Sequence, residues 1–455
     1  MRNSMKRKME VNPLEGGILR QMLLFALPVM GAALLQMLFS AADTAVIGRF
    51  GHPGALSAIG VSSAVINLLV GGLTALDAGV TVAAGRRYGQ GDREGVGKMV
   101  SALPPTALLL GGALAAAAVA LADPILGWMN CPAEIRTDAR LYFRIYFLGV
   151  PFLLTTGLLS AVLQARGNSF LPFLFQTGAA VINIALNLVF VIALDWNIAG
   201  VAAATVISEA LCAGALTLFM AQQRDETRLR LREMRLFRSL GEVFSIGIPS
   251  SLEGIVLNLS GVIIAAAINR FDAAVIAGNT VGTTIEGLIV VSFTGFANAS
   301  VVFISQNYGK GNFQRIGKIY RTTILSVFLI SESLGIAVYA LSPVLTRLFT
   351  QDALVMAHAR TRMFYMCLFF GGCGVMNVIS GCVRGLGEAR LPLIISILCS
   401  VVFRVTWIYT YAAGRGTVEA IYVSYPLCWG LCVALNAAAF HVTFRKKKAA
   451  AEAAA

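Results

Sequence analysis

The chain has 455 residues, of which 57% are hydrophobic and 13% are charged, and its formal net charge is +13. This composition is too apolar for a soluble domain and predicts a protein with many membrane spans. The positive charge does not indicate nucleic-acid binding, because the Lys and Arg residues lie in the segments between apolar runs, without an interleaved aromatic patch. The three His and eight Cys residues lack metal-site or catalytic spacing, so we expect no cofactor and no enzyme.

Apolar runs long enough to cross a hydrocarbon core of ~30 Å follow one another along the whole chain. They predict an all-α polytopic membrane protein with twelve transmembrane helices. We place these helices near residues 20–48, 55–84, 98–122, 140–165, 171–194, 198–222, 241–269, 275–305, 319–342, 359–384, 391–413 and 417–441.

The second half of the sequence repeats motifs of the first. Arg49-Phe50 recurs as Arg270-Phe271, and the turn sequence YGQGDREGVGK recurs as YGKGNFQRIGK. Because each half holds six helices, the two bundles enter the membrane in the same direction and are related by a pseudo-two-fold axis along the membrane normal. We expect an N-terminal bundle (1–221), a cytoplasmic linker (222–242), a C-terminal bundle (243–445) and a basic, Ala-rich tail (446–455). Paired bundles of this kind are typical of transporters.

The distribution of positive residues predicts the orientation in the membrane. Most of the 36 Lys and Arg residues lie on one side if both termini are cytoplasmic. Residues 1–17 are basic and polar without a cleavable apolar segment, so we expect no signal peptide. The sequence thus indicates a multi-pass protein of a bacterial-type inner membrane, with both termini inside.

The first predicted helix carries Asp43 inside its apolar run. An acid within a span is expensive and usually faces a cavity, where it binds or relays a cation. Gln36 and Phe39 lie seven and four residues before Asp43, so the three side chains share one helix face.

Counting the rise along the fifth and sixth helices places Asn183, Asn187 and Thr205 at a depth similar to that of Asp43. One carboxylate and several neutral oxygens suit Na⁺, and the carboxylate alone could hold a proton. We therefore predict a coupling site for Na⁺ or H⁺ at these four residues. The alternative is that the two asparagines and the threonine only join helices by hydrogen bonds.

The second half also has charges within its predicted spans. The helical rise places Glu286 and Arg404 near the midplane, where we expect them to pair, and Glu253 nearer the cytoplasm. These three residues either line a substrate cavity or form a static buried network. Glu209 and Glu332 lie within spans without an identified partner.

Two further residues carry expectations. Asp77 lies near the cytoplasmic end of the second predicted helix, where we expect it to be solvated. Pro28 interrupts the first helix, and a bend there could couple ion binding to the shape of the cavity.

Several segments together resemble the MATE family (multidrug and toxic compound extrusion). They are LPVMGAALLQMLFSAADTAVIGRFG, GVTVAAGRRYGQGD, INIALNLVFVIALDWNIAGVAAATVISE and SQNYGKG. The resemblance covers nearly the whole chain and implies antiporters that export amphipathic, often cationic compounds in exchange for Na⁺ or H⁺. It makes Asp43 the cation-linked acid, with Gln36, Asn183, Asn187 and Thr205 as its neighbours.

The chain departs from the family pattern in two places. Members of the DinF-like branch often carry an acid where Asn187 stands, and NorM-like members carry an acid in the tenth helix, which has none here. The second half therefore resembles the DinF-like branch more closely, whereas the Asn183 and Asn187 pair is similar to the NorM-like cation site.

Two other functions compete with antiport. A lipid-linked saccharide flippase of the same superfamily should present several cationic side chains to its cavity, and only Arg404 is a clear candidate. A membrane-embedded enzyme should show clustered acids or a nucleophile with its base, and the sequence has neither. The expected partners are small organic compounds and membrane lipid, with the protein acting as a monomer.

Overall fold

The computed structural model describes residues 11–52, 54–129, 131–230, 235–236 and 239–454. Within these ranges the regular elements are helices, and no strand occurs. The expectations for the N-terminal stretch 1–10 and for the linker residues 231–234 and 237–238 lie outside the described residues.

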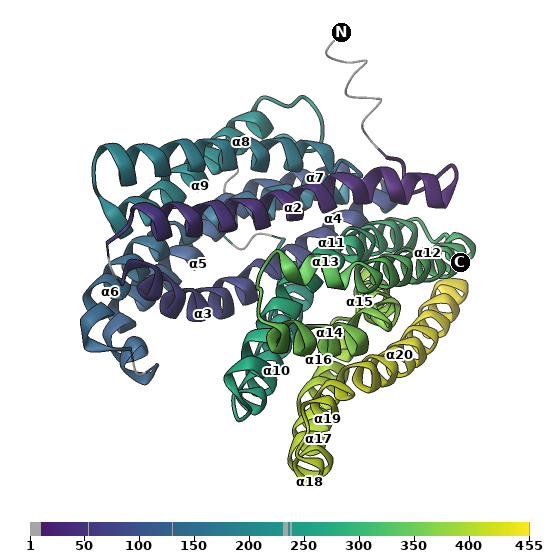
Figure 1. Ribbon diagram of the computed structural model, residues 1–455. Helices are drawn as coiled ribbons and strands as arrows, with labels where there is room; N and C mark the ends of the chain where they lie inside the picture. Colours follow the sequence, from purple (N-terminus) through teal and green to yellow (C-terminus); the bar gives the residue numbers. More distant parts are fainter. Residues whose placement is uncertain (1–10, 53, 130, 231–234, 237–238, 455) are drawn as a thin grey trace. The chain divides into compact units, whose positions relative to one another are not determined.

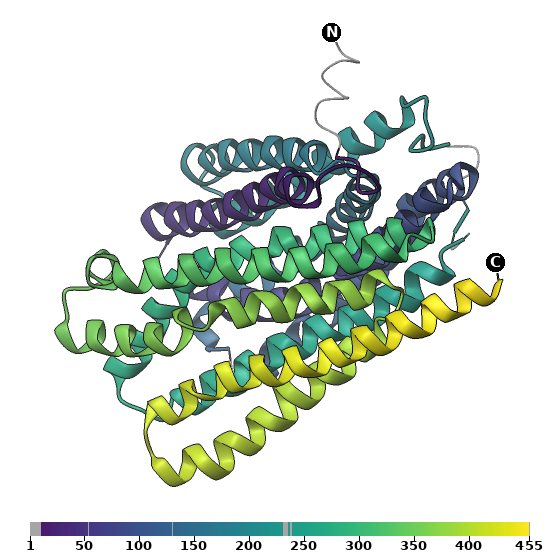
Figure 2. The ribbon, with the colours of Figure 1, turned by 90° about the vertical axis from the view of Figure 1, so that its right-hand side faces the viewer.

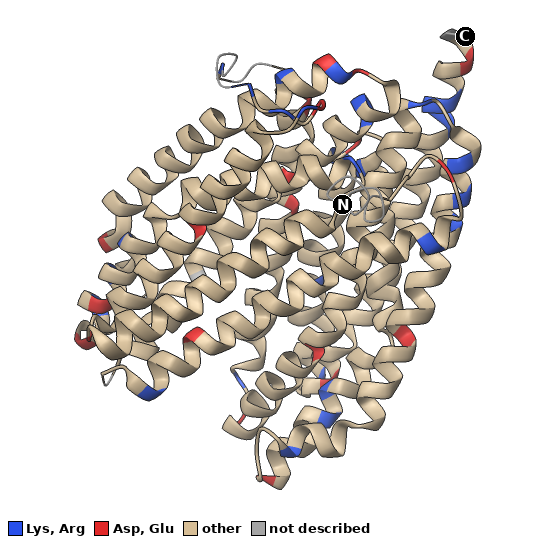
Figure 3. Ribbon diagram, turned by 90° about the horizontal axis from the view of Figure 1, so that it is seen from above, with Lys and Arg blue, Asp and Glu red and all other residues tan. Residues whose placement is uncertain are grey.

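Ten helices of the described chain are long and apolar enough to cross a membrane, and two bent helix pairs bring the number to twelve (Figure 1). The prediction of an all-α membrane protein with twelve spans is thus confirmed. Lys, Arg, Asp and Glu gather toward the helix ends and leave long uncharged stretches between them (Figure 3).

Each half of the chain contributes six spans. Those of the first half are α2 (Ile18–Phe50), α3 with α4 (Ala55–Thr74 and Leu76–Gln90), α5 (Arg93–Trp128), α6 with α7 (Ala133–Leu148 and Val150–Ala165), α8 (Phe170–Asn187) with its π-helical extension Leu188–Ala193, and α9 (Asn197–Ala221). Those of the second half are α10 (Gly241–Ile268), α11 (Ala273–Gly309), α12 (Phe313–Ala340) with α13 (Ser342–Arg347), α14 with α15 (Ala353–Cys367 and Phe370–Gly385), the run from α16 (Arg390–Ser396) through Ile397–Phe403, α17 (Arg404–Trp407) and Ile408–Ala412 to α18 (Ala413–Arg415), and α19 with α20 (Val418–Tyr422 and Ser424–Ala454).

The contacts divide the chain into two compact units that are not contiguous in sequence. Among the described residues, unit 1 lies within 31–251, and unit 2 comprises residues 11–30 and 252–454. Helices α2 and α10 therefore each contribute to both units. The change of unit follows Pro28 in α2 and Pro249 in α10 by two residues. The linear boundaries drawn from the sequence remain a prediction.

The first part of α10 belongs to unit 1 and the first part of α2 belongs to unit 2, and glycines let both segments pack closely there. In unit 1, a Cβ atom added to Gly79 of α4 would lie 2.2 Å from the Val243 carbonyl oxygen of α10. In unit 2, a Cβ atom on Gly295 of α11 would lie 2.7 Å from the Ala26 carbonyl oxygen of α2. Small residues are typical of such close helix contacts in membranes, where packing rather than hydrophobic burial drives association.

Helix α15 is the centre of unit 2 and packs against α11, α12 and α20 (Figure 2). Its face toward these helices carries Gly374, Gly381 and Gly385, whose added Cβ atoms would approach side chains of α11 and α12 to 3.0 Å or less. These glycines explain how closely α11 and α12 approach α15.

Two spans bend sharply. The angle is 41° between α6 and α7, where Pro151 lies in the first turn of the second helix, and 46° between α14 and α15. A proline at the first turn of a helix lacks the N–H that would bond to the preceding turn, which accounts for the first break.

The repeated glycine-rich segments are tight turns, as predicted. Gly91 and Gly311 adopt φ values of 75° and 74°, and Asp92 and Asn312 accept hydrogen bonds from the N–H groups of Gly95 and Arg315 at the start of the next helix. Left-handed backbone favours glycine, and Asp and Asn are common N-caps.

Candidate functional site

Unit 1 encloses a cavity of about 530 Å³ between its helices. Its wall is formed by the part of α2 after Gly31 and by α3, α4, α6, α7, α8 and α9. Asp43, Asp77 and Glu209 all line this cavity, whereas none of its described lining residues is Lys, Arg or His. The cavity thus contains three carboxyl groups without an internal cationic partner.

Asp43 lies at the centre of a hydrogen-bonded cluster. Asn187 donates a hydrogen bond from Nδ2 to Asp43 Oδ1. One terminal atom of the Asn183 amide lies 3.1 Å from Asp43 Oδ1 and 3.2 Å from Asn187 Nδ2, and the other lies 3.3 Å from Thr205 Oγ1. The structure therefore brings together the four residues at which the sequence predicts a coupling site.

The chemistry of this cluster fits a hard cation. Asn183 and Asn187 are buried, and Asn187 Oδ1 has no hydrogen-bond partner in the described structure. A buried carbonyl oxygen without a donor is costly, and a small cation would satisfy it together with the Asp43 carboxylate and the Thr205 hydroxyl. Such oxygen ligands are those that hard metal ions prefer.

Gln36 and Phe39 line the same cavity on the face of α2 that carries Asp43. Tyr142 and Tyr146 of α6 line it as well, with ring centroids 6.0 Å apart. The cavity thus offers aromatic faces, which attract organic cations, near its carboxyl groups.

The expectation for Asp77 is wrong, and Glu209, for which the sequence identifies no partner, lines the cavity of unit 1. Asp77 is not solvated at the cytoplasmic surface but lines the cavity, with Oδ1 buried and without a hydrogen-bond partner. The reason is the break at Ala75 between α3 and α4, which contains no Pro or Gly to signal it. Glu209 follows Thr205 by four residues on α9, and this spacing could have placed both on one face.

The acids of unit 2 have partners inside the protein. Glu253 forms an ion pair with Arg384 at 3.0 Å and accepts hydrogen bonds from Ser380 at 3.0 Å and Ser396 at 3.3 Å. Glu332 accepts a hydrogen bond of 2.8 Å from the N–H of Gly371, at the break between α14 and α15. Both acids are thus part of the internal structure of unit 2.

The expected pairing of Glu286 with Arg404 is wrong. Glu286 forms a two-pronged ion pair with Arg362 of α14, with distances of 3.0 and 2.8 Å. Arg404 instead donates a hydrogen bond of 2.9 Å to Ser260 and lies 4.5 Å from the centre of the Tyr425 ring. Depth along a helix does not determine which neighbour a side chain faces, and α11 packs directly against α14.

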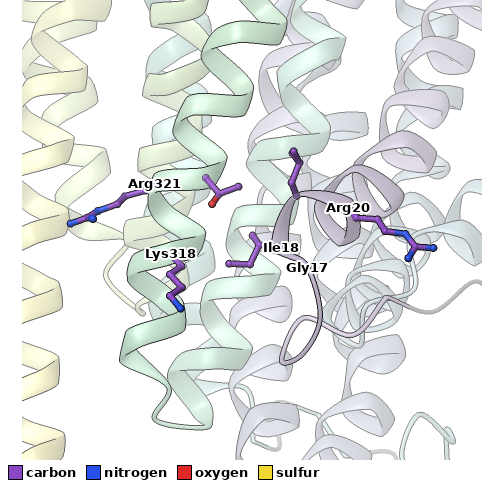
Figure 4. A pocket seen from close by; sticks show the side chains of 7 residues that line it. Gly17, Ile18, Arg20, Lys318 and Arg321 are labelled. Carbon is purple, nitrogen blue, oxygen red and sulfur yellow. The ribbon is translucent and has the colours of Figure 1, made fainter.

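A second hollow of about 500 Å³ lies in unit 2 where the start of α2 meets α12. Arg20, Lys318 and Arg321 line it, but Figure 4 shows these three side chains pointing in different directions. Arg315 fixes this corner by donating hydrogen bonds to the carbonyl oxygens of Pro13, Glu15 and Gly16. Diverging cations at a helix end are typical of the positive side of a membrane protein.

Comparison with protein families gives one match in each half of the chain. The MatE family matches residues 28–189 and 249–410. The second segment begins 221 residues after the first (249 against 28) and ends 221 residues after it (410 against 189), which is the repeat seen in the sequence.

Curated relatives cover most of the chain. A Thermotoga maritima protein called probable multidrug resistance protein NorM is 26% identical over 390 residues, covering 84% of this chain and 83% of that protein. The probable multidrug resistance protein YpnP of Bacillus subtilis is 25% identical over 402 residues, with 88% and 90% covered. The multidrug export protein MepA of Staphylococcus aureus is 23% identical over 417 residues, with 90% and 92% covered.

Solved structures share the fold. The Vibrio cholerae MATE transporter VcmN in its bent form aligns with a TM-score of 0.86 at 19% identity, over 94% of this chain and 98% of that one. A multidrug resistance MATE family transporter in an outward-facing conformation aligns with a TM-score of 0.85 at 22% identity, over 98% of both chains. The branch within the family, placed near the DinF-like members from the sequence, remains a prediction.

Proposed function

Because this chain belongs to the MatE family, we propose that it exports amphipathic, often cationic organic compounds in exchange for Na⁺ or H⁺ by alternating access. The chain is a multi-pass membrane transporter and not an enzyme. Its relatives are called multidrug resistance or multidrug export proteins, which supports organic compounds as the substrates.

The observation that carries this proposal is the contrast between the buried acids Glu253 and Glu286 of unit 2 and the acids that line the cavity of unit 1. In unit 2, Glu253 and Glu286 each form an ion pair. In unit 1, no described Lys, Arg or His lines the cavity that holds three carboxyl groups. A carboxylate in a membrane span is expensive unless a charge compensates it, so the cavity of unit 1 is suited to cations that arrive from outside the protein.

The coupling ion is assigned to Asp43. With Asn183, Asn187 and Thr205 it would bind Na⁺ through oxygen atoms, or it would bind a proton on its carboxylate. Export then follows from competition, because an ion bound at Asp43 and a cationic substrate in the same cavity disfavour each other. Gln36 and Phe39 would contact the substrate on the same wall. In this proposal Glu253, Glu286 and Arg404 serve the structure of unit 2 and do not bind substrate.

The change of access is assigned to the helices that cross between the units. Pro28 and Pro249 lack the N–H that would complete the helical hydrogen bonds and precede the change of unit by two residues. Bending of α2 at Pro28 would change the direction of the half-helix that carries Asp43 relative to the half before the proline.

Two further assignments belong to the proposal. The positive residues favour a bacterial-type inner membrane with both termini in the cytoplasm, and we propose that the protein acts there as a monomer. The flippase alternative gains no support, because Arg404 is engaged by Ser260 and Tyr425 and the cavity of unit 1 carries no described cation for an anionic lipid.

The test is ethidium efflux from cells that express the wild type or Asp43→Asn, with Na⁺ and pH gradients imposed separately. We expect efflux of the wild type to follow one of the two gradients and efflux of the variant to fall to the level of cells without the transporter. Efflux that ignores both gradients, or a variant that pumps normally, would contradict the proposal. Asp123→Asn is the matched control, because Asp123 pairs with Arg140 and Arg144 away from the cavity.

A further inference from the structure

Two acids in the cavity of unit 1 have no part in the coupling site around Asp43. Glu209 lies on α9 and Asp77 lies in the first turn of α4, and no described residue forms an ion pair or a hydrogen bond with either carboxylate. Neither carboxyl group maintains the fold in the way that Glu253 or Glu286 does in unit 2. Their position in the cavity therefore suits the binding of a cationic ligand.

Glu209 belongs to a stripe of cavity residues on α9. Thr205, Glu209 and Cys212 are spaced at i, i+4 and i+7, and all three line the cavity. Thr205 belongs to the Asp43 cluster through Asn183. The helical rise places Glu209 roughly 6 Å, and Cys212 roughly 10 Å, along the axis from Thr205. The acids of the cavity are thus arranged at successive levels rather than in one cluster.

Asp77 lies against α7. A Cβ atom added to Gly157 would lie 2.7 Å from Asp77 Oδ2, so glycine at position 157 leaves room for the carboxylate. Asp77 Oδ1 is buried and has no hydrogen-bond partner. Gly157 also lines the cavity, which places this carboxylate at the cavity wall formed by α4 and α7.

A hydroxyl group next to Gly157 is an independent sign of a ligand. Thr156 is 5% exposed, lines the cavity, and its Oγ1 has no hydrogen-bond partner in the described structure. The Cys212 thiol lies near the Thr156 hydroxyl, but the two groups form no hydrogen bond of ordinary geometry. A buried hydroxyl without a hydrogen-bond partner is unfavourable, and a ligand with an N–H donor that reached it would remove this cost.

The kind of ligand follows from the separation of the acids. The described residues contain no group of three His, Cys, Asp or Glu side chains placed to hold a metal ion. Carboxyl groups at separate levels, with the Tyr142 and Tyr146 rings on the wall, fit instead a long organic molecule that carries a positive charge at each end.

We propose that Asp77 and Glu209, with Thr156, form a second cation-binding subsite that makes the cavity selective for dicationic organic compounds. This inference rests on the proposed export of organic cations and specifies which of them bind most tightly. Asp43 remains the ion-coupling group, whereas Asp77 and Glu209 bind the charged groups of the substrate.

The test measures equilibrium binding to the purified, full-length transporter. The probes are dequalinium, which has two aromatic cations joined by an alkyl chain, and its single-headed analogue with one aromatic cation on the same chain. We expect Asp77→Asn and Glu209→Gln each to weaken dequalinium binding about tenfold, equivalent to ~1.4 kcal/mol, and to change binding of the analogue by less than about twofold. Asp123→Asn should change neither.

Two outcomes would overturn the proposal: equal losses for both probes, or unchanged binding of dequalinium in both variants. Thr156→Val is a milder change that should weaken dequalinium binding in the same direction, so the proposal stays testable if an acid variant does not fold. Binding is measured without an ion gradient. A failure here is therefore distinguishable from a failure of coupling, which the Asp43→Asn efflux experiment detects.

Discussion

Glu286 and Arg362 show how unit 2 accommodates charges inside the membrane. Their side chains are 7% and 6% exposed, and two hydrogen bonds connect them. Arg362 also donates a hydrogen bond of 2.7 Å to Asn279. Such a buried pair contributes little net free energy as long as it is complete, but the loss of one partner leaves a buried charge without compensation.

We therefore expect Glu286→Gln to lower the free energy of unfolding by about 3 kcal/mol. The double variant Glu286→Gln/Arg362→Met should recover much of this loss, because it removes the second charge as well. Thermal unfolding of the purified protein measures both. Glu388→Gln is the control, since its ion pair with Lys447 is long, at 3.9 Å, and partly exposed. A single variant as stable as the wild type would contradict a structural role for the pair.

Asp225, in the segment between α9 and α10, offers a prediction about pH. It follows α9 and accepts hydrogen bonds from Arg166, from Thr227 Oγ1 and from the Thr227 N–H. Burial alone would raise the pKa of Asp225, but the hydrogen bonds from Thr227 and Arg166 outweigh it, so the pKa lies below its ordinary value. A lowered pKa in the folded state gives stability that is present above the unfolded-state pKa of about 4 and is lost at lower pH.

Asp225→Asn should thus destabilise the protein at pH 7 by about 1 kcal/mol or less, because the group is partly exposed to solvent. The difference from the wild type should shrink as the pH falls below the pKa of the unfolded carboxyl group and through the lower pKa of the folded one. Unfolding temperatures measured at pH 7 and at about pH 3 test this. A difference that grows on acidification would show that the hydrogen bonds do not favour the ionised form.

The sequence predicts which residues lie at similar depth better than which residues touch. Asn183, Asn187 and Thr205 could be linked to Asp43 because spacing of four residues and the helical rise constrain them. The partner of Glu286 could not be predicted, because the rotation of each helix about its axis follows from packing with its neighbours. The location of Asp77 depends on a break that has no proline or glycine at Ala75.

At the level of the helices, α2 connects the two units. Residues 18–30 belong to unit 2 and residues 31–50 to unit 1, with Pro28 close to the change. Such an element can transmit a change at Asp43 to the packing of its other half. The length of this helix was predictable from hydropathy, but its division between two units depends on long-range contacts.

Replacing Pro28 by Ala would supply the missing backbone N–H and straighten the helix. We expect Pro28→Ala to bind ethidium as the wild type does and to export it at least several-fold more slowly, because the two end states then interconvert less readily. Efflux rates in cells, together with ethidium binding to the purified protein, test this. Pro124→Ala, which alters a proline near the end of α5, is the control. An unchanged efflux rate in Pro28→Ala would contradict a role for bending of α2 in the change of access.

At the scale of the whole molecule, the two repeats have diverged in charge. The MatE family matches both halves over corresponding segments, yet Glu253 and Glu286 of unit 2 are ion-paired, whereas the three carboxyl groups Asp43, Asp77 and Glu209 of unit 1 line a cavity. The number of helices and the internal repeat could be predicted from the hydropathy and the motifs. Which repeat carries acids without an ion-pair partner could be determined only from the side-chain contacts in the structure.

The most direct test of the account is whether substrate movement drives ion movement. In proteoliposomes with the membrane potential held at zero and no ion gradient, an ethidium gradient should move Na⁺ or H⁺ in the opposite direction, because coupling between two ligands is reciprocal. Asp43→Asn should abolish this ion flux, and Asp123→Asn should leave it intact. Ethidium transport without a counterflow of either ion, or a counterflow that persists in Asp43→Asn, would contradict the assignment of unit 1 as the coupling unit.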